Sequence, residues 1–179
     1  MNSIIGRKIP VMAVVLVLLL SAIVSPKLCA QQREAFFIAP TAEISGYGWN
    51  GIAWGGGIII GAGTGGALGL QLLYAADNES FVFLEMLFFL RVYIYGADAY
   101  SGPFVQLNLG PVLYADTKAE ITGYGNFSIG LNTGWRFLAG TNWYIEPAFR
   151  LGYPYLAGAG LSIGYRTAAG EPRRAENEE

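Results

Sequence analysis

The strongest constraint on this chain is a two-residue alternation that runs from Trp143 to Arg166 with one interruption. In 143–153 the odd positions are all apolar, and the even ones are Tyr144, Glu146, Ala148, Arg150 and Gly152. In 157–166 the odd positions are again apolar, and the even ones are Gly, Ser or Arg. Side chains alternate between the two faces of a strand. This segment therefore predicts two strands with one apolar and one polar face, which is typical of a transmembrane β-hairpin.

The same rhythm predicts six further strands earlier in the chain. We divide the apolar run 55–75 at Thr64-Gly65-Gly66 because Gly-Gly favours tight hairpin turns. The undivided run is also about twice the 9–11 residues that a spanning strand needs. The sequence defines this boundary less well than the others. The remaining strands are expected at 36–47, 81–95, 103–115 and 122–138.

Three places in the chain do not follow the simple alternation and are treated separately. Residues 46–54 are rich in Gly and aromatic residues and are expected to form a loop. Pro40 has no N–H for a sheet ladder, so we expect a bulge or a strand end there. Residues 81–95 are bulky on both faces and could form a helix, but their β-branched and aromatic content favours a strand.

Composition fits a single membrane domain. The chain has 179 residues, of which 53% are hydrophobic and only 13% are charged, whereas soluble domains carry roughly 25% charge. The net charge of −2 and the lack of a basic patch give no support to nucleic-acid binding.

The first 30 residues have the pattern of a signal peptide. Arg7 and Lys8 precede an apolar run from Val11 to Val24, and Ala30 offers a cleavage point. An uncleaved anchor is the alternative, although the run is short for a helical span of about 20 residues. Cleavage after Ala30 would remove Cys29, the single cysteine. Residues 168–179 are polar and charged and are expected to be a disordered tail.

Eight strands within 31–167 predict an all-β fold, namely a closed antiparallel up-and-down transmembrane β-barrel preceded by the signal peptide. An even strand number places both termini on the periplasmic side. Closure is needed because hydrocarbon offers no partner to the backbone groups of an open sheet edge.

Charged residues fall on the inward face. An eight-stranded barrel is just wide enough to be filled by side chains, and buried charges are costly unless they are paired. We therefore predict an ion-pair and amide network that plugs the lumen. An acid–base site or an ion pathway is the functional alternative. The charged members are Glu43, Glu85, Glu146, Arg91, Arg136 and Arg150, and the amides are Gln71, Gln106, Asn108, Asn126 and Asn132.

Catalytic and cofactor chemistry has little support. The sequence contains no histidine, the residue that most often activates serine or water. Without histidine, and with its single cysteine expected to be removed, the chain is also a poor metal binder. The Gly-x-Gly pairs at 61–63 and 158–160 are not full nucleotide fingerprints. We expect no enzymatic activity and no cofactor.

Aromatic residues gather near the predicted strand ends, where amphipathic rings prefer the headgroup level. We expect two girdles that include Trp49, Trp54, Tyr93, Trp135, Trp143 and Tyr165, with Tyr47, Tyr153 and Tyr155 among their further members.

With these features the chain resembles the small eight-stranded bacterial outer-membrane barrels of the OmpA/OmpX-like superfamily. The resemblance covers most of 36–167. Its most specific part is Gly160-Leu-Ser-Ile163-Gly-Tyr165, which is similar to the closing strand that the assembly machinery reads; here Arg166-Thr167 and the tail follow it. The resemblance implies the outer membrane of a diderm bacterium as the location.

Outer-membrane lipid and the assembly machinery are the expected partners, and the protein is expected to be a monomer. Fold alone does not fix the function of such barrels. A structural or surface-interaction role is expected. A lipid-modifying enzyme, a narrow pore and a helical inner-membrane protein are the alternatives.

Overall fold

The computed structural model describes residues 35–47, 51–63, 66–78, 80–94, 101–116 and 123–167. The expected signal peptide at 1–30, the tail at 168–179 and Trp49 lie outside the described residues. Within that part of the chain, no helix is long and apolar enough to cross a membrane.

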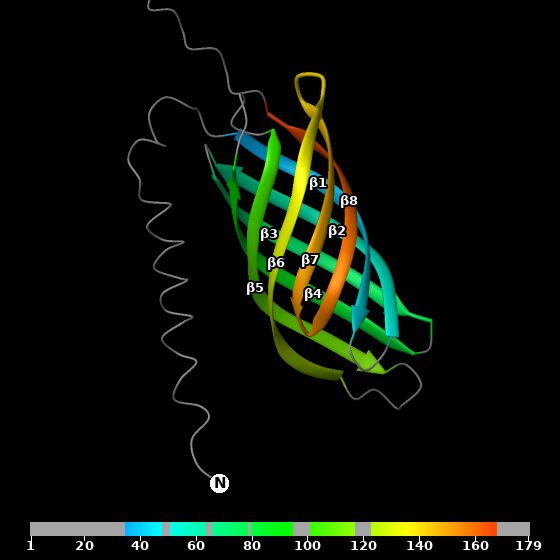
Figure 1. Ribbon diagram of the computed structural model, residues 1–179. Coiled ribbons are helices and arrows are strands. Elements are labelled where there is room, and N and C mark those ends of the chain that lie inside the picture. Colours follow the sequence, from blue (N-terminus) through cyan, green and yellow to red (C-terminus); the bar gives the residue numbers. More distant parts are fainter. Residues whose placement is uncertain are drawn as a thin grey trace, which may run out of the picture. The chain divides into compact units, whose positions relative to one another are not determined.

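Eight antiparallel strands form a closed barrel (Figure 1). Each strand pairs with its neighbours in sequence order, and the last strand returns to the first, with Phe37 opposite Arg166. The strands are β1 (Ala35–Tyr47), β2 (Gly51–Gly63), β3 (Gly66–Asp77), β4 (Phe81–Tyr93), β5 (Gly102–Asp116), β6 (Gly123–Ala139), β7 (Trp143–Tyr153) and β8 (Tyr155–Arg166).

The barrel has two rims that we name by the chain ends. At the terminal rim β1 begins and β8 ends, beside the connections 64–65, 94–101 and 140–142. At the distal rim lie the connections 48–50, 78–80, 117–122 and Pro154. Gly140, in the connection between β6 and β7, has a φ of +88°, a backbone conformation that glycine adopts without steric cost.

The predicted eight-stranded closed fold is confirmed, and β4 is a strand and not a helix. Two local expectations were wrong. The segment 46–54 is not one loop, because β1 extends to Tyr47 and β2 already begins at Gly51. Pro40 causes neither a bulge nor a strand end. It pairs in register with Ile58 of β2.

The ladder explains how β1 accommodates Pro40. The pairing of β1 with β8 passes from Ile38↔Tyr165 directly to Thr41↔Ser162 without a shift in register. The missing N–H therefore costs rungs on one side of the strand only. The register shift between β1 and β8 lies instead at Gly46/Tyr47, where Leu156 of β8 is the extra residue.

Burial separates the two faces of the wall. Large apolar side chains point outward and are exposed, including Phe88 (63%) and Leu68 (64%). The inward positions hold nearly all the buried polar and charged side chains, such as Glu85, Arg91 and Gln106. This is the reverse of a soluble domain, in which charged residues are almost never fully buried unless they are paired.

Candidate functional site: the charged lumen

All six charged side chains expected in the lumen lie there, in two groups. The terminal cluster, nearer the terminal rim, contains Arg91, Arg136 and Glu146. The distal cluster, nearer the distal rim, contains Arg150, Glu43 and Glu85. Every one of these side chains is at most 6% exposed.

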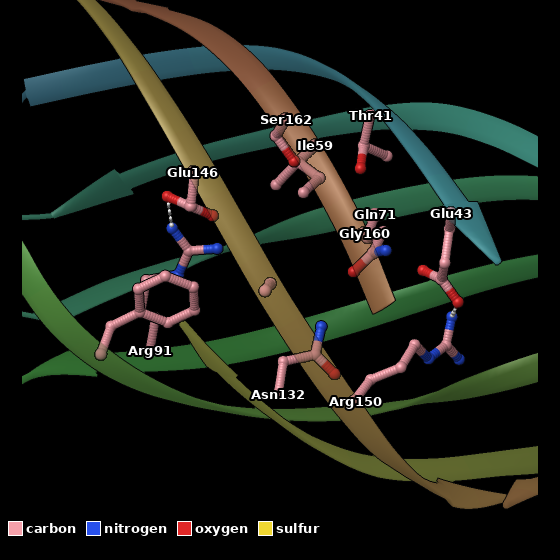
Figure 2. Close-up of a pocket in the computed structure, with 12 residues that line it drawn as sticks. Thr41, Glu43, Ile59, Gln71, Arg91, Asn132, Glu146, Arg150, Gly160 and Ser162 are labelled. Carbon is pink, nitrogen blue, oxygen red and sulfur yellow. Dashed lines mark hydrogen bonds and ion pairs between the residues drawn. The ribbon is translucent and has the colours of Figure 1, made fainter. Parts of the chain in front are cut away.

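One carboxylate serves two guanidiniums in the terminal cluster. Oε2 of Glu146 lies 2.8 Å from Nη1 of Arg91 and 2.7 Å from Nε of Arg136. Figure 2 shows Glu146 and Arg91 facing one another inside the wall. Charge-assisted bonds of this length are among the strong ones in proteins. With all three groups ionised, the terminal cluster carries a formal charge of +1.

Aromatic rings surround the terminal guanidiniums. The Arg91 Cζ lies 4.1 Å from the ring centroid of Phe104, and the Arg136 Cζ lies 3.7 Å from that of Tyr144. Phe37 contributes to both, at 5.6 and 4.6 Å. Cation–π contacts are stronger at desolvated sites such as this one. They matter here because Nη1 and Nη2 of Arg136 have no hydrogen-bond partner among the described residues.

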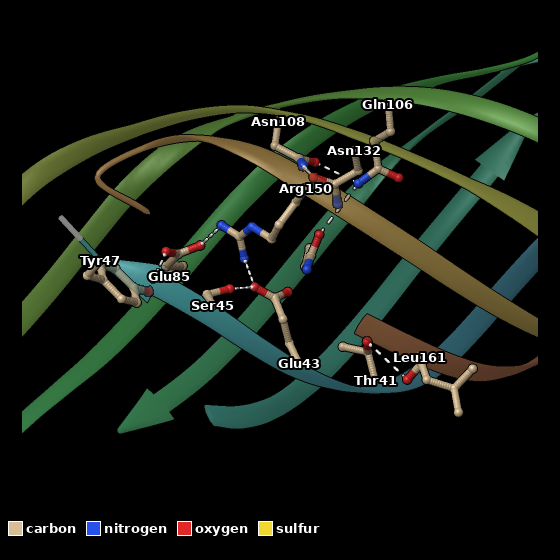
Figure 3. Close-up of polar contacts among 11 residues, drawn as sticks. Thr41, Glu43, Ser45, Tyr47, Glu85, Gln106, Asn108, Asn132, Arg150 and Leu161 are labelled. Carbon is tan, nitrogen blue, oxygen red and sulfur yellow. Dashed lines mark hydrogen bonds and ion pairs between the residues drawn. The ribbon is translucent and has the colours of Figure 1, made fainter. Parts of the chain in front are cut away.

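The distal cluster has the opposite balance. Arg150 donates from Nη1 to Glu43 at 2.6 Å and from Nη2 to Glu85 at 2.7 Å (Figure 3). Ser45 donates to the same Glu43 oxygen, and the Tyr47 hydroxyl lies 3.4 Å from Oε1 of Glu85. The formal charge of this cluster is −1, so the two clusters together are neutral.

Amide side chains extend from the terminal cluster into the middle of the lumen. Arg91 donates to Oε1 of Gln106 from Nε at 2.8 Å and from Nη2 at 2.6 Å. Gln106 then donates to Asn108 at 2.6 Å, and Asn108 to Asn132 at 2.8 Å. A longer contact of 3.5 Å joins Gln106 to Gln71. A chain of this kind satisfies polar groups that burial would otherwise leave costly.

Ion pairs cross the lumen between strands that are not neighbours. Arg91 and Glu85 belong to β4, and Glu146 and Arg150 belong to β7. Near the terminal rim the arginine comes from β4, and near the distal rim it comes from β7. The two strands are therefore joined by two ion pairs. Strand β4 supplies the arginine of one pair and the carboxylate of the other, and β7 supplies the reverse.

Aromatic clusters close both ends of this polar region. Near the terminal rim, Phe37, Phe89 and Tyr144 pack with small residues, and near the distal rim Tyr47, Phe83 and Tyr155 do the same. Tyr47 stacks on Phe83 with ring centroids 4.0 Å apart. Glycine makes room for these rings, since a Cβ at position 164 would overlap the ring of Tyr144.

Three tyrosines expected in the girdles belong to the lumen instead. Tyr93 accepts a hydrogen bond from Arg91 at 3.3 Å and packs edge-on against Phe104. Tyr47 and Tyr155 are buried in the distal aromatic cluster. The alternation turns Tyr47 and Tyr93 inward, whereas the girdle assignment used only their nearness to strand ends. Tyr155 has the outward parity of β8, but the register shift opposite Tyr47 turns its ring inward.

The other described girdle candidates, Trp54, Trp135, Trp143 and Tyr165, point outward and are exposed. Asn126, expected in the lumen, is exposed as well. It lies in the part of β6 that extends beyond the pairing with β7, which starts at Ile129↔Tyr153, and it donates to the Tyr153 hydroxyl at 2.9 Å.

Serines line the lumen among the described residues. Ser128 and Ser162 are buried, and the sequence has no histidine to activate them. No group of three or more potential metal ligands occurs in the described part of the chain. What the arrangement does is pair and bury charge.

No protein-family model matches the sequence, and no curated protein matches it either. The N-terminal β-barrel domain of Pseudomonas aeruginosa OprF superposes with a TM-score of 0.56 at 12% identity, covering 76% of this chain and all of that one. Neisserial surface protein A gives 0.54 at 13% identity, covering 75% and 96%. Ail, the attachment invasion locus protein of Yersinia pestis, gives 0.51 at 11% identity, covering 76% and 100%.

Identities this low establish the fold alone. The three barrels and the closed antiparallel sheet described above agree with the resemblance found in the sequence. This chain has the fold of the small eight-stranded outer-membrane β-barrels.

Proposed function

We propose that this protein is a monomeric outer-membrane barrel of a diderm bacterium with a structural role in the envelope and a plugged, non-conducting lumen. The observation that carries the proposal is the inverted distribution of side chains. Exposed apolar residues cover the outside, and three carboxylates and three guanidiniums pair inside. A wall of this kind suits hydrocarbon and would be insoluble in water.

The orientation follows from the chain ends. An even number of strands places both ends of the barrel at the same rim. We assign this terminal rim to the periplasm, as in other barrels of this kind. The connections at the distal rim are short, so this face offers little area for a large specific interface. That favours a structural role over adhesion.

Membrane lipid is the main partner. The outward rings of Trp54 near the distal rim, and of Trp143 and Tyr165 near the terminal rim, would lie at the two headgroup levels. Strand β8 carries the segment that is similar to a closing assembly signal. Its apolar residues Leu161, Ile163 and Tyr165 are exposed on the outer face, where the assembly machinery could read them.

The plug is a consequence of packing. The two aromatic clusters and the ion pairs support a plugged lumen, because eight strands enclose a space just wide enough for side chains to fill. Arg91, Arg136, Tyr144 and Tyr155 are among the largest fully buried side chains. An ion would have to displace these pairs, which is costly in a low-dielectric interior.

Envelope fractionation and gel mobility test the location and the fold. The protein is expected in the outer-membrane fraction and to migrate differently before and after boiling. Recovery in the cytosolic fraction, or identical mobility in both states, would contradict membrane insertion.

Planar-bilayer recordings test the plug. The purified protein should give no open-channel steps, and steady unitary steps would refute a sealed lumen. Comparison of lipid A from a deletion strain with that of its parent tests the absence of lipid-modifying activity. A difference restored by the intact gene would establish an enzyme instead.

A further inference from the structure

A small cavity lies in the lumen between the two charged clusters. Its volume is about 20 Å³, and a site needs roughly 10–15 Å³ by this measure to hold one water molecule. Figure 2 shows the Arg91–Glu146 pair on one side of it and the Arg150–Glu43 pair on the other. Gln71 and Asn132 lie between the two pairs, so most of the lining is polar.

Several polar atoms of the lining residues make no hydrogen bond within the described structure. The Nε of Arg150 is buried and has no partner. Both arginine contacts of Glu146 use Oε2, so Oε1 accepts no bond. The amides of Gln71 and Asn132 use their oxygens as acceptors and leave their nitrogens without an acceptor. Unsatisfied donors and acceptors thus line the same space.

We propose that this cavity holds one ordered water molecule that joins the terminal cluster to the distal cluster. The water accepts a hydrogen bond from the amide nitrogen of Gln71 or Asn132 and donates to the free oxygen of Glu146. A buried water typically makes about three hydrogen bonds to groups that would otherwise be unsatisfied. An empty cavity of this polarity would leave several buried groups without partners, each at a cost of about 1–3 kcal/mol.

The nearest groups set the orientation of the water. The terminal cluster is formally +1 and the distal cluster −1. These net charges alone would turn the oxygen of the water toward the terminal cluster, so the direct hydrogen bond to Glu146 Oε1, and not the net charge, directs a hydrogen toward that side. A free ion fits less well, because the six surrounding charges already sum to zero.

The aromatic clusters make this water slow to exchange. Tyr47, Phe83 and Tyr155 lie between it and the distal rim, and Phe37 and Tyr144 between it and the terminal rim. Exit through either rim therefore requires the rings of one cluster to move aside. The inference depends on the lumen geometry and not on membrane insertion, so it can be tested in detergent micelles.

Magnetic relaxation dispersion of water oxygen-17 counts long-lived internal waters in the folded, micelle-bound protein. Ala148 lines the cavity, so Ala148→Val should fill it and lower the count by one. Ala159→Val is the matched control, because Ala159 is exposed on the outer face of β8. It should leave the count unchanged.

An unchanged count in Ala148→Val, or a wild-type protein without long-lived water, would overturn the proposal. Should Ala148→Val fail to fold, a crystal structure of the wild type that resolves ordered waters decides the question. Density within hydrogen-bond distance of Glu146 Oε1 supports the proposal. An empty cavity, or a monatomic ion identified by anomalous scattering, refutes it.

Discussion

Replacing Glu146 with glutamine tests the ion-pair reasoning most directly. Among the described residues, Glu146 is the one carboxylate that contacts Arg91 and Arg136, at 2.8 and 2.7 Å, and all three groups are buried. Glutamine preserves the volume but leaves two guanidiniums without a counter-charge. Breaking one buried pair from one side costs about 3–5 kcal/mol. Because one carboxylate serves both arginines, we expect a loss at the upper end of that range.

Glu43→Gln is the matched control. Glu43 is one of two carboxylates on Arg150, and Glu85 remains bound at 2.7 Å when Glu43 is neutralised. The loss should then be nearer that of one hydrogen bond to a charged group, about 1.5–3 kcal/mol. Urea-induced unfolding of the barrel in lipid vesicles, followed by tryptophan fluorescence, gives the free energy of unfolding of each variant.

A double variant separates the unpaired charge from other effects. If Glu146→Gln is costly because it leaves Arg136 without a counter-charge, then adding Arg136→Gln should recover part of the lost free energy of unfolding. The combined cost would be smaller than the sum of the single ones. Equal losses for Glu146→Gln and Glu43→Gln, or strictly additive costs in the double variant, would refute the view that pairing stabilises this lumen.

Two further predictions concern packing and the outer wall. Gly164→Ala would force a Cβ into the ring of Tyr144 and should lower the folded yield, measured by gel mobility without boiling; Gly46→Ala, whose nearest contact is an ordinary 3.7 Å, should fold normally. Equal yields would contradict the packing argument. Phe88→Arg, in the middle of the outer wall, should cost about 2–4 kcal/mol in vesicle unfolding, and Tyr165→Arg near the rim no more than about 1. The same cost at both positions would argue against a membrane-embedded wall.

The sequence predicted the fold well because alternation is a local signal. In β7 and β8 every second residue is apolar, and the structure reproduces the two strands nearly to the residue. The start of β2 was missed for a physical reason. Gly51 and the residues up to Trp54 were assigned to a glycine-rich loop, but the strand continues through them. The glycines that follow show why this strand is rich in glycine, because a Cβ at 55 or 57 would overlap the backbone of β3. Glycine in this strand makes room for a neighbour and does not mark a turn.

For the lumen, the sequence predicted that inward charges pair, but not which residues meet. The alternation places Arg91 and Glu146 on the inward face, but they are 55 residues apart and meet only because the closed barrel sets their heights. Nothing local in the sequence shows that Glu146 serves two arginines. The inward rings of Tyr47 and Tyr93 were misplaced because nearness to a strand end was given more weight than the alternation. The inward ring of Tyr155 depends on a register shift between β1 and β8 that the alternation does not show.

The cross-lumen pairs also bear on how the barrel selects its register. A slip of one residue moves every side chain of a strand to the opposite face. For β7 that would bring Glu146 and Arg150 into contact with lipid and leave Arg91 and Glu85 of β4 without partners. A slip of two residues would keep each side chain of β7 on its present face of the wall. It would still separate both ion pairs, because β4 supplies the arginine near one rim and β7 supplies it near the other. Backbone hydrogen bonds alone tolerate either slip. We infer that the buried charges, whose net contribution to stability is small when they are paired, serve chiefly to penalise wrong registers of this wall.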